Sequence, residues 1–181
     1  MHLRVLCLEF VILTLKNFAL NAPCSQCANY SNWTPDKAVD GNSQSCSQTD
    51  VWSKVYYSRH IHWWRVDLGK LILVSYIVIT NTMDNCCSDR LANFTVELGS
   101  LESNGSITYT VCRYHDGVAG PLTSLNCTRS IWGQFVRISL TGVALTLCEV
   151  EVMATRTTVA QDISQQCRSS RPTSPVTTLV L

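Results

Sequence analysis

Hydrophobic and polar residues alternate along the middle of this chain with the period of two that is typical of β-strands. Residues 63–69 alternate and end at Gly69, with Trp64, Val66 and Leu68 on the apolar side, and residues 94–98 repeat the pattern. Residues 71–80 are instead rich in Ile, Val and Tyr, as in a strand buried on both faces. Without sustained helical periodicity, the pattern predicts an all-β fold, either a sandwich or a jelly roll. Further strands are predicted over residues 107–114, 134–140 and 147–153.

The two ends of the chain differ from this middle part. Residues 1–15 combine a basic start with a short apolar run that Glu9 interrupts, and we predict a signal peptide here, with an incomplete start as the alternative. After residue 154 the composition changes to Thr, Ser, Gln and Arg, which predicts a disordered tail over residues 155–181. The predicted domain therefore covers residues 16–154, and its apolar runs are too short for a transmembrane helix.

Composition narrows the class of function. The formal net charge of +1 over 181 residues gives no basic stripe for nucleic acid. Eight of the ten cysteines lie in the predicted domain, an even number that fits a disulfide framework, and zinc is disfavoured because Cys24-Ser-Gln-Cys27 has no matching second pair. Together with five N-glycosylation sequons, the cysteines predict a secreted, extracellular protein. The sequons begin at Asn29, Asn32, Asn93, Asn104 and Asn126.

Two of the cysteines, Cys86 and Cys87, are adjacent. Neighbouring Cα atoms lie about 3.8 Å apart, closer than the 4.4–6.8 Å typical of a disulfide, so a bond between them would be strained. Such strain is found mostly at functional sites. The product would be a rigid apolar platform beside Arg90, suited to the C–H face and hydroxyl groups of a sugar. Two free or separately paired thiols are the alternative.

Four segments in order along the chain carry a family resemblance. They are residues 36–42 (DKAVDGN) with Ser45-Cys46, 63–69 (WWRVDLG), 79–81 (ITN) with 86–90 (CCSDR), and 147–152 (LCEVEV). The chain resembles the F-type lectins, or fucolectins, which implies a β-jelly roll like that of galactose-binding and discoidin-type domains, a bound calcium ion and fucose recognition beside an adjacent disulfide. The resemblance also implies the disulfides Cys46–Cys148, Cys86–Cys87 and Cys112–Cys127. It leaves Cys24 and Cys27, which could pair with each other.

The expected cofactor is calcium. Asp40-Gly41-Asn42 offers a carboxylate and a turn that can direct carbonyl oxygens inward, as calcium requires, although such a tripeptide is also an ordinary turn. The ligand set comes from the resemblance. It implies main-chain oxygens from Lys37, Asn42 and Cys148 and side-chain oxygens from Asp40, Ser45 and Glu149.

The expected carbohydrate site departs from the family pattern. Fucose recognition in the family rests on a histidine and two arginines, of which only Arg90 is present here. Met83 stands in place of the first arginine and Gln48 in place of the histidine. An amide still donates a hydrogen bond, whereas a thioether cannot. The long segment 49–62 carries tyrosines and histidines that could rebuild a site. The candidate residues are Arg90, Cys86, Cys87, Gln48 and Met83.

The sequence therefore predicts a secreted, calcium-binding lectin-type module for fucose-type glycans, with a partly degenerate fucose motif. The alternative is a structural or protein-binding adhesion module that keeps the fold and the calcium but has lost sugar binding. A phospholipid binder is a third class, with Trp33 and Trp52 as candidate apolar spikes. Enzyme motifs are lacking, so no enzymatic activity is expected. Glycans are the expected partners, and homo-oligomerisation is left open.

Overall fold

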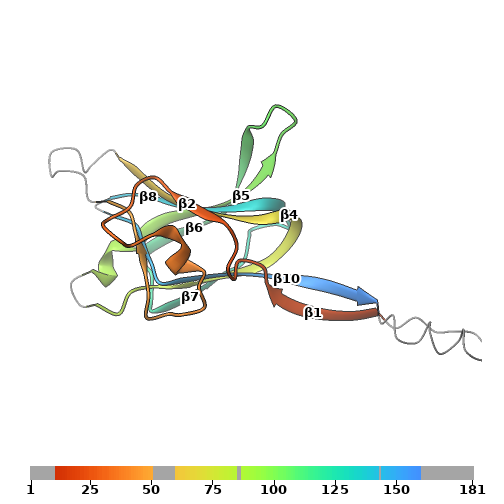
Figure 1. Cartoon of the computed structure of the whole chain (residues 1–181), viewed down its shortest axis with the longest axis horizontal. Helices are drawn as coiled ribbons and strands as arrows, with labels where there is room; N and C mark the ends of the chain where they lie inside the picture. Colours follow the sequence, from red (N-terminus) through yellow and green to blue (C-terminus); the bar gives the residue numbers. More distant parts are fainter. Residues whose placement is uncertain (1–10, 51–59, 85–86, 143, 160–181) are drawn as a thin grey trace, which may run out of the picture. The chain divides into compact units, whose positions relative to one another are not determined.

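The computed structural model describes residues 11–50, 60–84, 87–142 and 144–159, and within them it confirms the predicted all-β class (Figure 1). In this part of the chain, no helix is long and apolar enough to cross a membrane. The elements are β1 (Val11–Asn17), β2 (Cys24–Gln26), η1 (Pro35–Ala38), β3 (Ser47–Gln48), β4 (Ile61–Thr80), η2 (Ser88–Arg90), β5 (Ala92–Leu101), β6 (Ile107–Val118), β7 (Leu122–Leu125), β8 (Trp132–Thr141), β9 (Thr146–Leu147) and β10 (Glu149–Val159).

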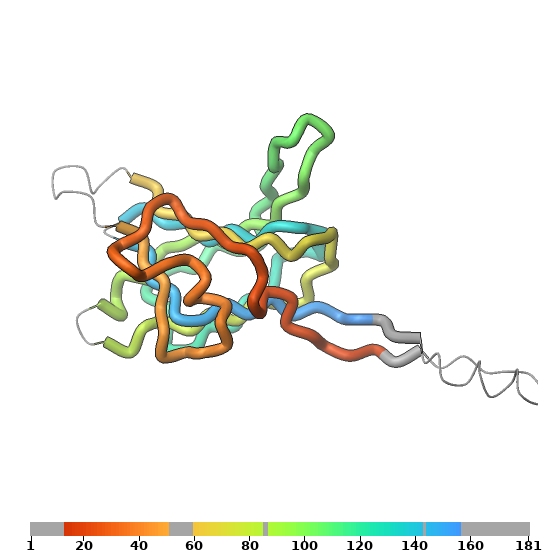
Figure 2. Tube along the Cα trace, viewed as in Figure 1, coloured from red at the N-terminus to blue at the C-terminus, as the bar shows by residue number. Residues whose placement is uncertain are grey.

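Strand β4 belongs to both layers of the sandwich. Its first half pairs with β2 and β8, and β8 continues the layer through β5 to β6. Its second half pairs with β10 and β7 in the other layer, and β1 lies beside β10, as Figure 2 shows in red and blue. Between Asp67 and Ile72 the register with β8 shifts, and Gly69 has a φ of 73° that favours glycine. The chain thus passes from one layer to the other without leaving the strand.

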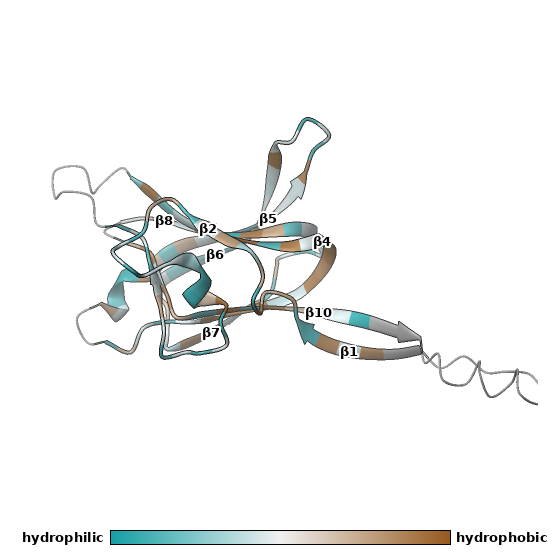
Figure 3. Cartoon of the chain, viewed as in Figure 1, coloured by the Kyte–Doolittle hydropathy of each residue, from teal (hydrophilic) through white to brown (hydrophobic). Residues whose placement is uncertain are grey.

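One hydrophobic core fills the space between the layers. Trp64 and Val66 from the first half of β4 and Ile77 and Ile79 from its second half belong to the same buried cluster. The alternation predicted over residues 63–69 is confirmed, because Leu68 is buried with them while the intervening side chains are partly exposed. Figure 3 shows the same alternation of hydrophobic and hydrophilic residues along the strands. The core therefore depends on the period of two that the sequence displays.

Two details of the strand prediction are wrong. Gly69 does not end a strand, because β4 continues through it for 20 residues in all. Residues 71–80 are not buried on both faces, since Leu71 is 55% and Leu73 40% exposed. This half of β4 lies in a layer whose outer face has no third layer over it in the described structure, so only alternate residues reach the core.

The chain divides into two compact units. One comprises residues 15–155 and contains the sandwich, and the other comprises residues 1–14 and 156–181. Strand β1 begins at Val11, inside the segment predicted as a signal peptide, and β10 continues to Val159, beyond the predicted domain limit. Residues 1–10 and 160–181, on which most of those two predictions fall, lie outside the described part. Both remain predictions.

Two disulfides of the sandwich agree with the pairing that the family resemblance implies. They are Cys46–Cys148, over a separation of 102 residues, and Cys112–Cys127. Cys24 and Cys27 are free thiols, so the option that they pair with each other is not realised. Burial, and to a smaller extent Asp36, raises the pKa of Cys24 to about 11, which keeps this thiol protonated and a poor nucleophile.

A buried histidine joins β4 to two loops. His62 is 1% exposed, and its Nδ1 lies 2.9 Å from Thr49 Oγ1, which accepts a hydrogen bond from the Leu145 amide at 2.8 Å. The Thr49 hydroxyl hydrogen is then free to be donated to Nδ1, which suits the neutral ring. Burial is the main cause that lowers the pKa of His62, and the nearby His60 lowers it further.

We expect buried His62 to contribute a loss of stability as the pH falls below about 6.5, the ordinary pKa of an unfolded histidine, because the unfolded chain then binds a proton that His62 in the folded protein does not. His62→Gln retains a hydrogen-bond acceptor and donor without titrating in this range. The melting temperature of the natural protein should fall more between pH 7.5 and pH 5.5 than that of His62→Gln. Equal pH dependence of the two proteins would contradict this role for His62.

Candidate functional site

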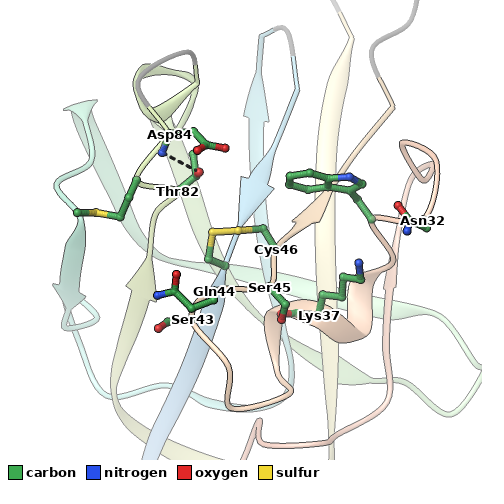
Figure 4. A pocket seen from close by; sticks show the side chains of 11 residues that line it. Asn32, Lys37, Ser43, Gln44, Ser45, Cys46, Thr82 and Asp84 are labelled. Carbon is green, nitrogen blue, oxygen red and sulfur yellow. Dashed lines mark hydrogen bonds between the residues drawn. A yellow bond between two sulfur atoms is a disulfide. The ribbon is translucent and has the colours of Figure 1, made fainter.

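Two adjoining pockets lie among the loops of the sandwich, and they share Trp33, Thr82 and Asp84 as lining residues. The first, of about 280 Å³, is called the Arg90 pocket. It is lined by Tyr30, Trp33, Gln48, Thr82, Asp84, Cys87, Arg90 and Thr146. The second, of about 390 Å³, is called the Lys37 pocket (Figure 4). It is lined by Asn32, Trp33, Lys37, Ser43, Gln44, Ser45, Cys46, Thr82, Met83, Asp84 and Cys148.

The Arg90 pocket brings together three of the five predicted carbohydrate residues, namely Gln48, Cys87 and Arg90. Cys87 is disulfide-bonded. Cys86, its predicted partner, lies outside the described residues, so the adjacent disulfide remains a prediction. Met83 is 74% exposed and lines the Lys37 pocket instead. The Met83 thioether therefore lies beside the Arg90 pocket and does not line it.

Gln48 is held by its backbone and its side-chain oxygen. It lies in β3, which pairs with β9, and it is only 6% exposed. Its carbonyl accepts hydrogen bonds from Gln26 Nε2 at 2.9 Å and from the Tyr30 amide at 3.0 Å, and its Oε1 lies 3.4 Å from Thr146 Oγ1. Among the described residues, Gln48 Nε2 donates to no protein acceptor. This amide can therefore donate a hydrogen bond to a ligand in the pocket.

Arg90 stands at the end of the short η2 turn, where its amide donates to the Cys87 carbonyl at 3.2 Å. Its side chain is half-buried, and within the described structure its guanidinium has neither a carboxylate nor a hydrogen-bond partner. The five donors of a guanidinium are thus available to ligand oxygen atoms. Arg90 and Gln48 supply donors, while Tyr30 and Trp33 supply aromatic surface suited to a sugar ring.

The buried side chain of Asn81 holds the loop that carries this site. Asn81 is 2% exposed, and its Nδ2 donates to the carbonyls of Ser88 at 2.7 Å and Ala119 at 3.2 Å. Its Oδ1 accepts from the Thr82 amide at 2.8 Å. One amide therefore ties both ends of the loop over residues 82–88 to the sandwich.

Sequence reasoning missed five lining residues of the Arg90 pocket, and no local pattern marks most of them. The sequence suggests Trp33 only as an apolar side chain for membrane contact. In the structure it is half-buried and lines both pockets. Trp52, the other candidate spike, lies outside the described residues, as does most of the segment 49–62. The five missed residues are Tyr30, Trp33, Thr82, Asp84 and Thr146.

The predicted calcium ligands meet around Ser45. Its Oγ lies 2.5 Å from Asp40 Oδ2, 3.1 Å from the Asn42 carbonyl oxygen and 3.4 Å from the Lys37 carbonyl oxygen. A single hydroxyl hydrogen cannot be donated to three acceptors at once. Four oxygen atoms therefore lie close together with one hydroxyl hydrogen among them, and this arrangement favours the binding of a cation.

Glu149 adds a buried carboxylate to this group. It is 6% exposed, its Oε2 accepts a hydrogen bond from the Gly41 amide at 3.2 Å, and its buried Oε1 has no partner among the described residues. Burial, and next the charge of Asp40, raises the pKa of Glu149 to about 7. An unpaired buried carboxylate oxygen is costly unless a cation or proton satisfies it.

These residues fit calcium better than a transition metal. Among the described residues, no three or more His, Cys, Asp or Glu side chains are grouped so that they could hold a metal ion by themselves. The six predicted ligand residues offer instead two carboxylates, a hydroxyl and main-chain oxygens, the hard donors that calcium prefers. The Cys46–Cys148 disulfide lies next to both Ser45 and Glu149 in the chain and so holds the two halves of the set together.

The fold and the paired pockets define a β-sandwich binding module whose ligand sites are carried by loops. Residues 37–138 match the family model described as the NedA-like, galactose-binding domain. The chain is 32% identical over 148 residues to Fucolectin-5 of Anguilla japonica, covering 78% of this chain and 77% of that protein. It is 35% identical over 123 residues to Fucolectin-1 of the same species, covering 66% and 67%.

Two solved structures extend the comparison. The fucolectin from striped bass (Morone saxatilis) serum has 32% identity and a TM-score of 0.64, and the match covers 78% of this chain and 49% of that one. A Streptococcus pneumoniae fucose-binding module, SpX-3, has 28% identity and a TM-score of 0.61, with 76% and 96% covered. The chain belongs to the F-type lectin, or fucolectin, family, and its fold is an all-β sandwich of the galactose-binding type. It is a binding module and not an enzyme.

We expect Asn81→Ala to lower the free energy of unfolding by about 1–3 kcal/mol, because it leaves the buried Thr82 amide and two carbonyls without their partner. Chemical denaturation measures the change. Gln134→Ala is the matched control, since it removes an amide that makes one bond, to Asp67 Oδ1, at a partly exposed position. If both substitutions cost the same, Asn81 has no special part in holding the loop.

Proposed function

We propose that this chain is a secreted carbohydrate-recognition module that binds fucose-type sugars weakly in the Arg90 pocket and is stabilised by calcium. One observation carries the proposal: Gln48 is far in sequence from Cys87 and Arg90, yet all three line one pocket together with two aromatic side chains. The fucolectin and fucose-binding relatives support fucose as the sugar.

The replaced arginine supports weak rather than tight binding. A hydrogen bond to a charged group contributes about 1.5–3 kcal/mol, and each 1.4 kcal/mol changes affinity about tenfold. Met83 cannot donate such a bond, and its side chain is largely exposed. Arg90 and Gln48 remain as donors, so the proposed affinity for free fucose is in the millimolar range.

The proposed calcium site adjoins the second pocket, because three of its ligand residues, Lys37, Ser45 and Cys148, line the Lys37 pocket. Lys37, Asn42 and Cys148 would hold the ion through main-chain oxygens, and Asp40, Ser45 and Glu149 through side-chain oxygens. When bound, calcium would neutralise the two carboxylates and so stabilise the folded arrangement of these segments. The unpaired Glu149 Oε1 and the crowded oxygen atoms around Ser45 are the observations that support it.

The sugar proposal is tested by restoring the missing donor. Met83→Arg combined with Gln48→His should strengthen fucose binding by about tenfold or more over the natural protein, as one regained charged hydrogen bond would. Arg90→Ala in that background should remove the gain. Calorimetric titration with fucose, and with glucose as the control sugar, measures all three proteins.

Two results of this titration would count against the proposal. No fucose binding by the natural protein or the double variant would favour the alternative, an adhesion module that has lost sugar binding. A gain that survives Arg90→Ala would place the sugar outside the Arg90 pocket.

The calcium proposal is tested by thermal unfolding. Adding calcium to chelator-treated protein should raise the melting temperature, because a ligand bound only to the folded state stabilises that state. Asp40→Ala should abolish the rise, whereas Asp67→Ala, which removes a carboxylate on β4, should leave it intact. A melting temperature that calcium does not change in the natural protein would refute the site.

A further inference from the structure

We propose that the Lys37 pocket binds an acidic group, a carboxylate or a sulfate ester, on the saccharide residue next to the fucose. The inference rests on the proposed function, because it places fucose in the adjoining Arg90 pocket. It adds a specificity: the preferred glycan would be both fucosylated and anionic.

Continuity of the two pockets is the first observation. Trp33, Thr82 and Asp84 line both, so a sugar seated against Arg90 has the Lys37 pocket beside it. The second pocket is the larger, about 390 Å³ against about 280 Å³. Its walls include Trp33 and Met83, which offer apolar surface for a ring or a methyl group. A glycan longer than one residue would therefore extend from the first pocket into the second.

An unpaired cation is the second observation. Lys37 is half-buried, yet within the described structure its ammonium has no carboxylate within 4.0 Å, no hydrogen bond and no aromatic ring. Asp36 and Asp40, its acidic neighbours in sequence, form no ion pair with it. Such an ammonium group has already lost part of its hydration on folding. Binding of an anion to it is therefore favourable, because little further desolvation of the ammonium opposes the ion pair.

The two charged side chains that line the pocket lie on opposite sides of it. Figure 4 shows Lys37 and Asn32 on one side of the pocket and Asp84 with Thr82 on the opposite side. Gln44 and Ser43 also lie on the side of Asp84, so Asn32 is the amide on the Lys37 side that can donate to a carboxylate or sulfate oxygen. Asp84, the one carboxylate lining this pocket, repels an anion from its own side. The ligand would therefore be oriented with its acidic group toward Lys37.

The proposed calcium site leaves the Lys37 side chain available to bind an anion. In the proposed calcium site Lys37 contributes only its carbonyl oxygen, so its ammonium is not required there. Replacing the side chain consequently separates anion recognition from calcium binding. The expected gain from one partly screened ion pair is about fivefold in affinity.

The test compares immobilised fucosylated trisaccharides by surface plasmon resonance, since a dense surface makes weak binding measurable. The three probes are a neutral trisaccharide, the same core with a carboxylate-bearing sialic acid, and the same core with a sulfate ester. All proteins carry Thr34→Ala, which removes the Asn32 sequon at the rim of the pocket without changing Asn32. The variants are Lys37→Gln and the matched control Lys70→Gln, which removes an exposed lysine on β4.

The expected result is a ratio of acidic to neutral affinity of about five in the Thr34→Ala protein and in the Lys70→Gln variant, falling to about one in Lys37→Gln. A gain with the sialylated probe alone would assign a carboxylate, and a gain with both probes would assign charge as such. A calcium-induced rise in melting temperature that persists in Lys37→Gln would show that this variant is intact.

Three outcomes would overturn the inference. Equal binding of neutral and acidic probes by the Thr34→Ala protein would remove the acidic subsite while leaving the fucose proposal in place. A preference for acidic probes that persists in Lys37→Gln would place the anion elsewhere. No binding of any fucosylated probe would refute the proposed function itself, and this inference with it.

Discussion

The Cys46–Cys148 disulfide is the constraint on which the functional end of this sandwich depends. It joins segments 102 residues apart in the sequence, and each cysteine is flanked by a residue of the crowded oxygen cluster, Ser45 on one side and Glu149 on the other. Immediately beyond it, β3 pairs with β9 and fixes Gln48 in the Arg90 pocket. One covalent bond thus determines the spacing of both the oxygen cluster and the pocket.

The loops around this bond carry the binding groups, and the sheets hold the loops. Such a division is common, because a rigid scaffold can keep loop side chains in place while their identity varies. Here the sheets retain the family architecture, and the two predicted departures from the fucose motif, Met83 and Gln48, lie at the pockets. Substitutions at such positions would change binding specificity without changing the sheets. Lys37 lines the adjoining pocket and supplies a positive charge there. Its motif marks only its main-chain oxygen.

The sequence predicted the strands in which hydrophobic and polar residues alternate and the segments that match a family motif. The alternation around Trp64 predicted the buried face of β4, and the motif residues predicted the oxygen cluster. Strands β2, β3 and β7 were missed because two to four residues are too few to display a period. Tyr30 and Thr146 were missed because only tertiary structure brings them to Arg90. The continuity of β4 through Gly69 was missed because a glycine with positive φ ordinarily signals a turn.

Strand β4 also has a consequence for how the molecule responds to pulling force. Because one uninterrupted strand is hydrogen-bonded in both layers, the layers cannot slide apart unless that strand first loses its partners in one of them. Tension applied through a surface-bound glycan at the loops would be shared by β8 and β10 through β4. The module should therefore resist shear between its two layers as a single mechanical element.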